Sequence, residues 1–259
     1  MSDQPLVAVS LKMYLSAART RSWVRSVADL LGDPGPVEVA LLPSFPVLES
    51  TAQTLADTAI AWGAQDCASS EAGAQTGEVS AEVLAELGCR YVEVGHAERR
   101  RLFAEDQATV LAKTRQVIQA GLTPLYCVGE LEHRTPRAAA EICIEEFDHL
   151  AADSPALAGG HPLVLAYEPV WAIGAAEPAP AGHAAEVCGR LREHALRTAP
   201  AVRVIYGGAA GPGTFTGLKE SADGLFLGRF AHDPHALATV VAEVRQHAIN
   251  PRTRTRSGY

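Results

Sequence analysis

The chain has 259 residues, of which 47% are hydrophobic and 20% are charged, as is typical of a globular protein with a large buried core. Its formal net charge of -8 leaves no broad basic surface, so we expect neither nucleic acid nor a membrane as its main partner. The five cysteines are scattered without metal-ligand spacing, so no zinc site and no disulfide framework are predicted. The first residues lack the features of a secretion signal, and we expect a cytoplasmic protein.

Short apolar runs alternate with helix-like segments along the whole chain. Strands are predicted at Leu6–Leu11, Val37–Leu42, Ala59–Gln65, Cys89–Val94, Thr123–Val128, Leu163–Tyr167, Val202–Tyr206 and Gly224–Gly228. The clearest helical patterns between and after them are Ser16–Leu31, Asp106–Ala120, Thr135–Ala151, His183–Thr198 and Pro234–Ala248.

Most of these strands are continuously apolar, as expected for parallel strands that are buried on both faces. Eight strand-helix units in a chain of this length predict an α/β protein, a single-domain (β/α)8 (TIM) barrel over residues 1–249. The long segment Asp66–Glu78, rich in Ala, Ser and Gly, predicts a functional or interaction loop. The basic, unpatterned segment 250–259 is expected to be disordered.

Three polar residues that could carry chemistry follow predicted strands. Lys12 follows the first strand, His96 the fourth and Glu168 the sixth, so in a barrel all three lie at the carboxyl end of the strands. Each residue alone is more often structural than catalytic. Together, a base, a hydrogen-bond donor and a cation are the groups needed to remove a proton beside a carbonyl and to stabilise the enediolate.

Glycines follow the seventh and eighth predicted strands. Gly207 and Gly208, which precede Ala209, and Gly228, which precedes Arg229, would let backbone N–H groups approach an anion closely. Ordinary turn glycines are the alternative. Because barrels often bind phosphate at these two loops, the sequence favours a phosphate site there.

Five motifs, in this order along the chain, resemble those of the triose-phosphate isomerase family. They are GAQTGE (Gly73–Glu78), VGHAERR (Val94–Arg100), YCVGE (Tyr126–Glu130), AYEPVWAIG (Ala166–Gly174) and YGG (Tyr206–Gly208). The resemblance covers nearly the whole chain and implies an isomerase of a small phosphorylated sugar that needs neither a metal nor an organic cofactor.

The resemblance also implies roles for individual residues. Glu168 would abstract the carbon-bound proton, and neutral His96 would donate a hydrogen bond to the carbonyl and move protons between oxygens. Lys12 would stabilise negative charge on the substrate, and Glu98 would support this part of the site. The segment Gly73–Glu78 implies a homodimer, in which Thr76 reaches towards the neighbouring subunit's site.

The resemblance further implies a lid that closes over the phosphate and excludes water. Pro169–Trp171 would form its first hinge, and Gly174 would belong to its tip. The second half of the lid, residues 175–178, departs from the family pattern.

Several substrate-binding positions also depart from the pattern. Ser10 stands where the family has asparagine, Ala97 and Ala209 stand where serine is usual, and Arg229 replaces the second glycine of the eighth loop. Ser10 could make room at the end of the substrate away from the phosphate, and Arg229 could add a charged contact.

These departures resemble the family's tetrulose-phosphate branch, which interconverts erythrulose 1-phosphate and erythrulose 4-phosphate. Alternatives are triose-phosphate isomerase itself, acting on dihydroxyacetone phosphate, a silent barrel that serves as a scaffold, and an unrelated phosphate-binding barrel enzyme. The intact Lys12, His96 and Glu168 argue against a scaffold.

Overall fold

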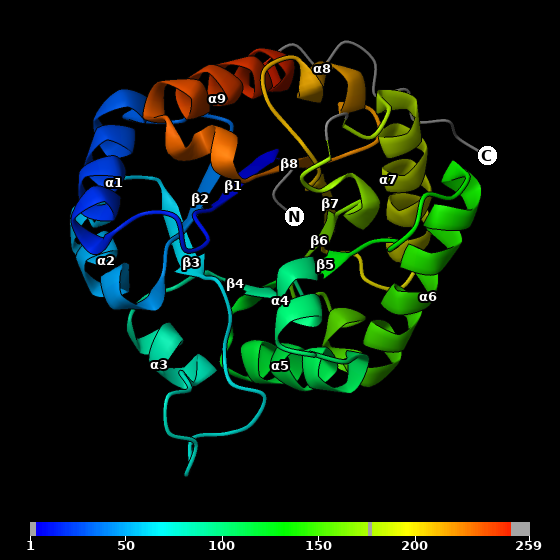
Figure 1. Ribbon diagram of the computed structural model, residues 1–259, viewed down its shortest axis with the longest axis horizontal. Helices are drawn as coiled ribbons and strands as arrows, with labels where there is room; N and C mark the ends of the chain where they lie inside the picture. The colour runs from blue at the N-terminus through cyan, green and yellow to red at the C-terminus, as the bar shows by residue number, and fades with distance from the viewer. Residues whose placement is uncertain (1–3, 176–177, 250–259) are drawn as a thin grey trace.

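The computed structural model describes residues 4–175 and 178–249, and the predicted disordered tail, 250–259, lies outside them. Eight parallel strands pair in chain order, and β8 pairs with β1 to close the barrel. This confirms the predicted (β/α)8 barrel, in which the strands lie in the middle and the helices surround them (Figure 1). The strands are β1 (Leu6–Ser10), β2 (Glu38–Leu42), β3 (Ala61–Ala64), β4 (Tyr91–Val94), β5 (Thr123–Val128), β6 (Leu163–Tyr167), β7 (Val202–Tyr206) and β8 (Gly224–Leu227).

The helices follow the strands in the order that a barrel requires. They are α1 (Ala17–Leu31), α2 (Leu48–Leu55), α3 (Ala81–Glu86), α4 (Ala97–Leu102), α5 (Gln107–Gln119), α6 (Pro136–Asp153), α7 (Ala181–Ala195), α8 (Thr214–Leu218) and α9 (Pro234–Ile249). Four 3-10 turns join them: η1 (Phe45–Val47), η2 (Pro155–Leu157), η3 (Val170–Ala172) and η4 (Arg229–His232). Within the described residues, none of the helices has the length and apolar character needed to cross a membrane.

The predicted boundaries of all eight strands lie within two residues of the observed ones, and at the third strand both ends move inward. Ala59–Gln65 was expected, and β3 spans Ala61–Ala64. The reason lies in the pairing, because Ala61 and Trp62 pair with β2 while Gly63 and Ala64 pair with β4. Because β3 has only two paired residues on each side, its regular structure is shorter than its apolar run.

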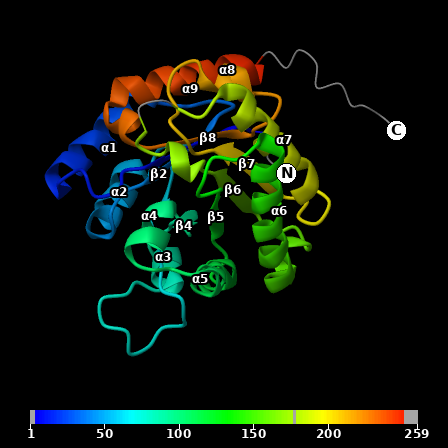
Figure 2. The same ribbon diagram turned by 45° about the vertical axis from the view of Figure 1, so that its right-hand side comes forward.

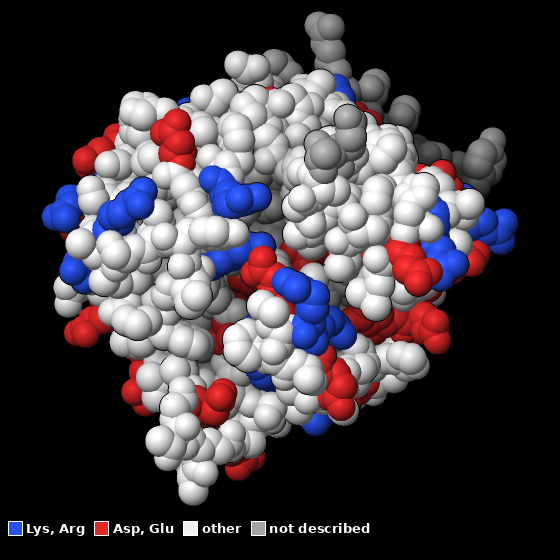
Figure 3. Space-filling model, viewed as in Figure 1, with Lys and Arg blue, Asp and Glu red and all other residues white. Residues whose placement is uncertain are grey.

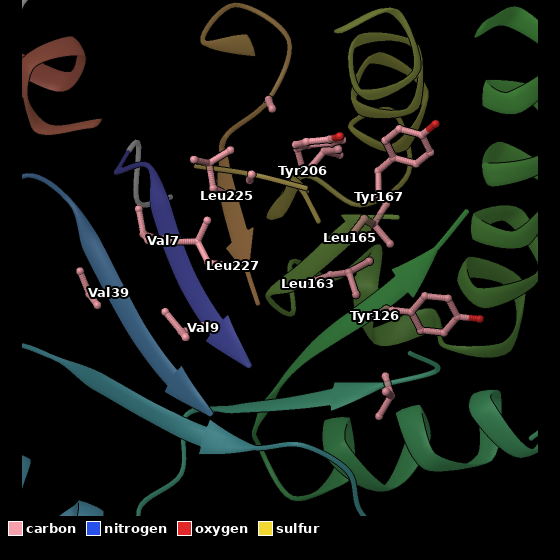
Figure 4. Packing of buried hydrophobic residues seen from close by; sticks show 14 of the residues in the cluster. Val7, Val9, Val39, Tyr126, Leu163, Leu165, Tyr167, Tyr206, Leu225 and Leu227 are labelled. Atoms are coloured by element: carbon pink, nitrogen blue, oxygen red, sulfur yellow. The ribbon is translucent and has the colours of Figure 1, made fainter. Parts of the chain in front are cut away.

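Alternate residues of each strand enter two separate apolar cores. Val7 and Val9 of β1 and Leu163 and Leu165 of β6 point away from the barrel axis towards the helices (Figure 4). Their neighbours along the strands instead fill the barrel interior, and they include Leu6, Ala8, Tyr91, Val164 and Ala166. This two-residue alternation determines which side chains reach the end of the barrel where the strands finish.

The amino end of the barrel interior is filled by a polar network. Tyr91 donates a 2.6 Å hydrogen bond to Glu38, and Arg203 contacts the second Glu38 oxygen at 2.6 Å and the Tyr91 hydroxyl at 2.7 Å. Burial raises the pKa of Glu38, but Arg203 and Tyr91 bring it below its ordinary value, so the side chain is ionised. These residues lie at the opposite end of the strands from Lys12, His96 and Glu168, and we read the network as structural.

The β3–α3 loop (residues 65–80) projects from the barrel, and Figure 2 shows it extending well beyond the helices. Its first residues are tied down by a buried ionic cluster. Lys113 of α5 lies 2.7 Å from Asp66 and 2.6 Å from Glu105, and Arg99 of α4 contacts both carboxylates. Removing one member of such a buried cluster leaves an uncompensated charge, so the base of the loop is firmly held.

Candidate active site

The last inward-facing layer of the barrel carries three polar side chains. Leu6 and Ala8 of β1 face the interior, and two residues after Ala8 comes Ser10. The same two-residue alternation places Glu93 inward after Tyr91 on β4, and Glu168 inward after Val164 and Ala166 of β6. Ser10, Glu93 and Glu168 are each no more than 3% exposed, so this layer is a buried polar floor below the mouth of the barrel.

Glu168 is closely packed against two glycines that directly follow the neighbouring strands β5 and β7. A Cβ atom on Gly129 would lie 1.8 Å from the Glu168 carbonyl oxygen, which no side chain could tolerate. On the other side, a Cβ atom on Gly207 would lie 3.0 Å from the Glu168 Cγ atom. Gly207, predicted as part of a phosphate loop, therefore also makes room for the Glu168 side chain.

The Glu168 carboxylate faces the residues that follow β4. Its Oε1 lies 3.1 Å from His96 Nε2, and its Oε2 accepts a long, 3.4 Å hydrogen bond from the Ala97 N–H. Burial raises the pKa of Glu168, but His96 and Lys12 together bring it below the ordinary value. Glu168 is therefore ionised at neutral pH, as a general base must be.

His96 is the N-cap of α4, and its ring is oriented by the backbone of that helix. The Glu98 N–H donates a 3.1 Å hydrogen bond to His96 Nδ1, so Nδ1 carries no proton and the ring hydrogen is on Nε2. Burial lowers the pKa of His96, whereas Glu168 and Glu93 raise it, to about 9. The two carboxylates thus favour a protonated ring, but an imidazolium could not accept the bond from Glu98, and this hydrogen bond keeps the ring of this structure in its neutral form.

Lys12 reaches the same group of residues from the other side of the mouth. Its Nζ donates a 2.8 Å hydrogen bond to Glu98 Oε1, and its backbone adopts a left-handed φ of 50°. The Lys12 carbonyl oxygen accepts hydrogen bonds from Ser44 Oγ and Gln65 Nε2. Neighbouring loops thus fix an unfavourable backbone conformation, which directs the ammonium group towards the site.

Glu93 is the site residue that the motifs did not single out. Ser10 Oγ donates a 2.8 Å hydrogen bond to Glu93 Oε2, and Glu93 Oε1 lies 4.0 Å from His96 Nε2. The available signal was a carboxylate in an otherwise apolar strand two residues before Gly95. That carboxylate indicates a site residue only once the closed barrel is known, because the alternation of inward and outward residues then places the Glu93 side chain in the interior.

The first hinge of the expected lid is anchored to a buried carboxylate. Glu130 Oε1 accepts hydrogen bonds from Trp171 Nε1 at 2.6 Å and from the Tyr167 hydroxyl at 3.1 Å, and it lies 3.2 Å from His183 Nε2. Trp171 lies in η3, and Gly174 follows with a left-handed φ of 75°. Residues 176 and 177 of the altered lid segment lie outside the described residues.

The seventh and eighth loops flank the same mouth. Gly208 and Gly228 are half-buried, while Ala209 and Arg229 are exposed. The Arg229 guanidinium lies 5.8 Å above the ring of Tyr14, which belongs to the loop after β1. A contact between these two loops therefore determines where the Arg229 charge lies.

Thr76 is exposed on the projecting β3–α3 loop, and the structure does not bring it into contact with the other site residues of its own chain. Within the ranges that the structure describes, no group of three or more His, Cys, Asp or Glu side chains is arranged to hold a metal ion.

The assembled residues define a class of protein. Charged side chains of both signs gather around the hollow near the centre of the face in Figure 3. An ionised carboxylate, a neutral imidazole and an ammonium group converge at the carboxyl end of a (β/α)8 barrel. This arrangement is that of a barrel enzyme suited to proton transfer at a carbon beside a carbonyl.

Comparisons with known proteins identify the family. The model of the triosephosphate isomerase family matches residues 5–244, so the chain belongs to that family and is an isomerase, an intramolecular oxidoreductase. The chain is 43% identical over 254 residues to an L-erythrulose-1-phosphate isomerase of Pectobacterium atrosepticum, covering 94% of this chain and 97% of that relative. It is 39% identical over 232 residues to a triosephosphate isomerase of Thermus thermophilus, covering 86% and 92%. A Mycobacterium tuberculosis triosephosphate isomerase is 38% identical over 256 residues, covering 93% and 97%.

Proposed function

We propose that this enzyme interconverts erythrulose 1-phosphate and erythrulose 4-phosphate. The observation that carries the proposal is the combination of an intact Lys12, His96 and Glu168 with Ser10, which stands where the family has the larger asparagine. The 43% identity to an L-erythrulose-1-phosphate isomerase supports the same substrate.

The chemistry uses one base and one hydrogen-bond donor. Erythrulose 1-phosphate has its carbonyl at C2 and a C–H bond at C3. Glu168 removes the C3 proton, the C–H electron pair forms the C2–C3 double bond, and the carbonyl oxygen becomes an enediolate oxygen. His96 Nε2–H stabilises that oxygen, and the ring moves the proton of the C3 hydroxyl to it. Glu168 then returns its proton to C2, which leaves the carbonyl at C3 and the phosphate at the far end.

The phosphate is assigned to the seventh and eighth loops. Gly207, Gly208 and Ala209 on one side and Gly228 and Arg229 on the other would present backbone N–H groups and one guanidinium to it. The positive charges near these two loops favour the binding of an anion. Burial lowers the pKa of the nearby His232, and the cations Arg229, Arg19 and Lys12 lower it further. Gly174, at the far end of the lid hinge, would close over this site.

The test is a comparison of kcat/KM for erythrulose 1-phosphate and dihydroxyacetone phosphate with the same preparation of the wild-type enzyme. We expect the four-carbon substrate to be preferred. A preference of about a hundredfold or more for dihydroxyacetone phosphate, equivalent to roughly 2.7 kcal/mol, would instead identify a triose-phosphate isomerase. Binding of a phosphate-bearing inhibitor without turnover of either sugar would indicate a scaffold.

We also propose that the enzyme is a cytoplasmic homodimer. The projecting β3–α3 loop supports the dimer, because its apolar and small residues extend beyond the barrel while its base is fixed by the Lys113 cluster. In that dimer Thr76 would lie against the site of the neighbouring subunit. The five cysteines are buried and form no disulfide among the described residues, which supports the proposed cytoplasmic location.

A further inference from the structure

The Ser10–Glu93 pair lies in the active-site floor, and the mechanism above gives it no role. Glu93 is 2% exposed and Ser10 is 3% exposed, so water does not freely solvate either group. Among the described residues, Ser10 donates a hydrogen bond to Glu93 Oε2, whereas Glu93 Oε1 lies 4.0 Å from the nearest nitrogen of His96, beyond hydrogen-bond distance. A buried carboxylate with so few partners is costly unless another group completes its environment.

The chemistry of the pair restricts what that group can be. The Ser10 hydroxyl hydrogen is used in the bond to Glu93. The atoms of the pair that remain open to a bound molecule are the carboxylate and hydroxyl oxygens, which are hydrogen-bond acceptors. When Glu93 is ionised, a phosphate or a carbonyl oxygen would be repelled, and a methyl group would leave the acceptors unsatisfied. A hydroxyl group, which donates a hydrogen bond, satisfies them.

The proposed substrate has two hydroxyl groups. The first is on C3, one of the reacting carbons, and His96 handles its proton. The second is on C4, the hydroxymethyl group that a three-carbon substrate lacks. It extends away from the phosphate, on the side where Ser10 replaces a larger side chain.

We propose that Glu93, held in place by Ser10, accepts a hydrogen bond from the C4 hydroxyl group and thereby makes the enzyme selective for four-carbon over three-carbon ketose phosphates. This specificity role rests on the proposed function. It deepens that function by naming the residues that distinguish the two substrates.

The protonation state of Glu93 is compatible with this role. Burial raises its pKa to about 7, with His96, Ser10 and Lys12 acting in the opposite direction and Glu168 in the same one. The carboxylate accepts from a hydroxyl group, and the protonated form can both donate to it and accept from it. The C4 hydroxyl group is therefore bound on both sides of neutral pH.

The experiment measures kcat/KM for erythrulose 1-phosphate and for dihydroxyacetone phosphate in the wild type, Glu93→Gln, Glu93→Val and Ser10→Ala. We expect the ratio of the two values to fall at least tenfold in Glu93→Val, which corresponds to about 1.4 kcal/mol. Smaller falls are expected in Glu93→Gln and Ser10→Ala. The value for dihydroxyacetone phosphate should fall by a smaller factor than the value for erythrulose 1-phosphate, because that substrate has no C4 hydroxyl group to lose a contact.

Glu38→Gln is the matched control. It also removes a buried carboxylate that is bonded to a neutral hydroxyl, but at the amino end of the barrel. It should lower stability without changing the substrate ratio. Binding of 2-phosphoglycolate, which lacks a hydroxymethyl group, checks that each variant retains a folded site. If Glu93→Val does not fold, Glu93→Gln and Ser10→Ala carry the test.

The outcomes separate this inference from the proposed function. Equal losses for both substrates in the Glu93 variants would mean that Glu93 acts through His96 or through folding, and would overturn the specificity role. A wild-type enzyme that prefers dihydroxyacetone phosphate would overturn the proposed function, and the specificity role with it. An unchanged ratio in every Glu93 and Ser10 variant of an enzyme that prefers erythrulose 1-phosphate would overturn the specificity role alone.

Discussion

At the scale of single residues, the contacts of Glu168 decide how it can act as a base. Among the described residues, its carboxylate faces the Ala97 N–H at 3.4 Å and the His96 nitrogen at 3.1 Å, and the Cys127 thiol also bonds to it. The side chain is 3% exposed, so these groups rather than water surround the base.

Glu168→Gln should slow proton transfer strongly while leaving the site intact. The amide has nearly the same shape but cannot take the carbon-bound proton, so we expect kcat to fall by about 10²–10⁴-fold. Exchange of solvent deuterium into the substrate carbon should disappear in parallel. The dissociation constant of 2-phosphoglycolate serves as the control, and a variant that keeps wild-type exchange would contradict the role of Glu168 as the base.

Glu93 should make the stability of the protein depend on pH. Because burial raises its folded pKa from 4.5 to about 7, the folded state keeps a proton that the unfolded chain has already lost within that interval. The contribution of Glu93 to the free energy of unfolding therefore decreases as pH rises from about 4.5 to 7. We expect Glu93→Gln to gain on the order of 1–3 kcal/mol relative to the wild type between pH 5 and pH 8. Urea unfolding curves at several pH values measure this difference, and a constant difference would contradict it.

At the scale of elements, the floor of the site comes from the strands and the rest of the site comes from loops. Ser10, Glu93 and Glu168 project from or directly follow strands that are hydrogen-bonded on both sides, whereas Lys12 and the lid belong to loops. The lid hinge joins the two systems, because Trp171 of η3 is bonded to Glu130, which follows β5.

Trp171→Phe tests that hinge. The phenyl ring keeps most of the packing but removes the N–H that donates to Glu130, and the loss of one hydrogen bond to a carboxylate costs about 1.5–3 kcal/mol. A hinge that is less firmly anchored should close the lid less often and expose the enediolate to water. We expect kcat/KM to fall roughly tenfold, and the release of inorganic phosphate per turnover to rise.

Trp62→Phe in β3 is the control for this prediction. Among the described residues, the Trp62 Nε1 atom is buried and has no hydrogen-bond partner, so its removal leaves no acceptor unsatisfied. Phosphate release should stay at the wild-type level in this variant. Equal phosphate release by both variants would mean that Trp171 does not control the lid.

At the scale of the whole molecule, the projecting β3–α3 loop is the feature that a lone barrel least explains. Its base is tied to α4 and α5 by the Asp66, Arg99, Glu105 and Lys113 cluster, yet residues 71–78 are all exposed. Such a rigid base with an exposed tip is suited to insertion into a second subunit.

Thr76→Arg should weaken that assembly. An arginine in a closely packed pocket of the neighbouring subunit would bring steric overlap and an unpaired charge, so we expect monomers at micromolar concentration and at least tenfold lower kcat/KM. Sedimentation velocity measures the assembly, and Thr239→Arg, on an exposed part of α9, is the control. A wild-type protein that is monomeric and fully active would contradict the proposed dimer.

The sequence was enough to predict the barrel because its buried parallel strands are continuous apolar runs, such as Leu163–Tyr167, that need no partner to be recognised. Lys12, His96 and Glu168 could be predicted because each directly follows such a run. Glu93 could not, since its inward direction follows from closure of the barrel. The position of Arg229 could not be predicted either, because it depends on contact with Tyr14, more than 200 residues away in the chain.

The last inward layer of the strands has a consequence for how such enzymes diverge. Because Ser10 and Glu93 stand on strands, a change at either position alters the floor without changing the residues after β6, the loops after β7 and β8 or the projecting β3–α3 loop. New substrate preferences can therefore arise by one or two substitutions in the sheet while the machinery of turnover is inherited unchanged. Selection can act on the choice of sugar and on the speed of reaction separately.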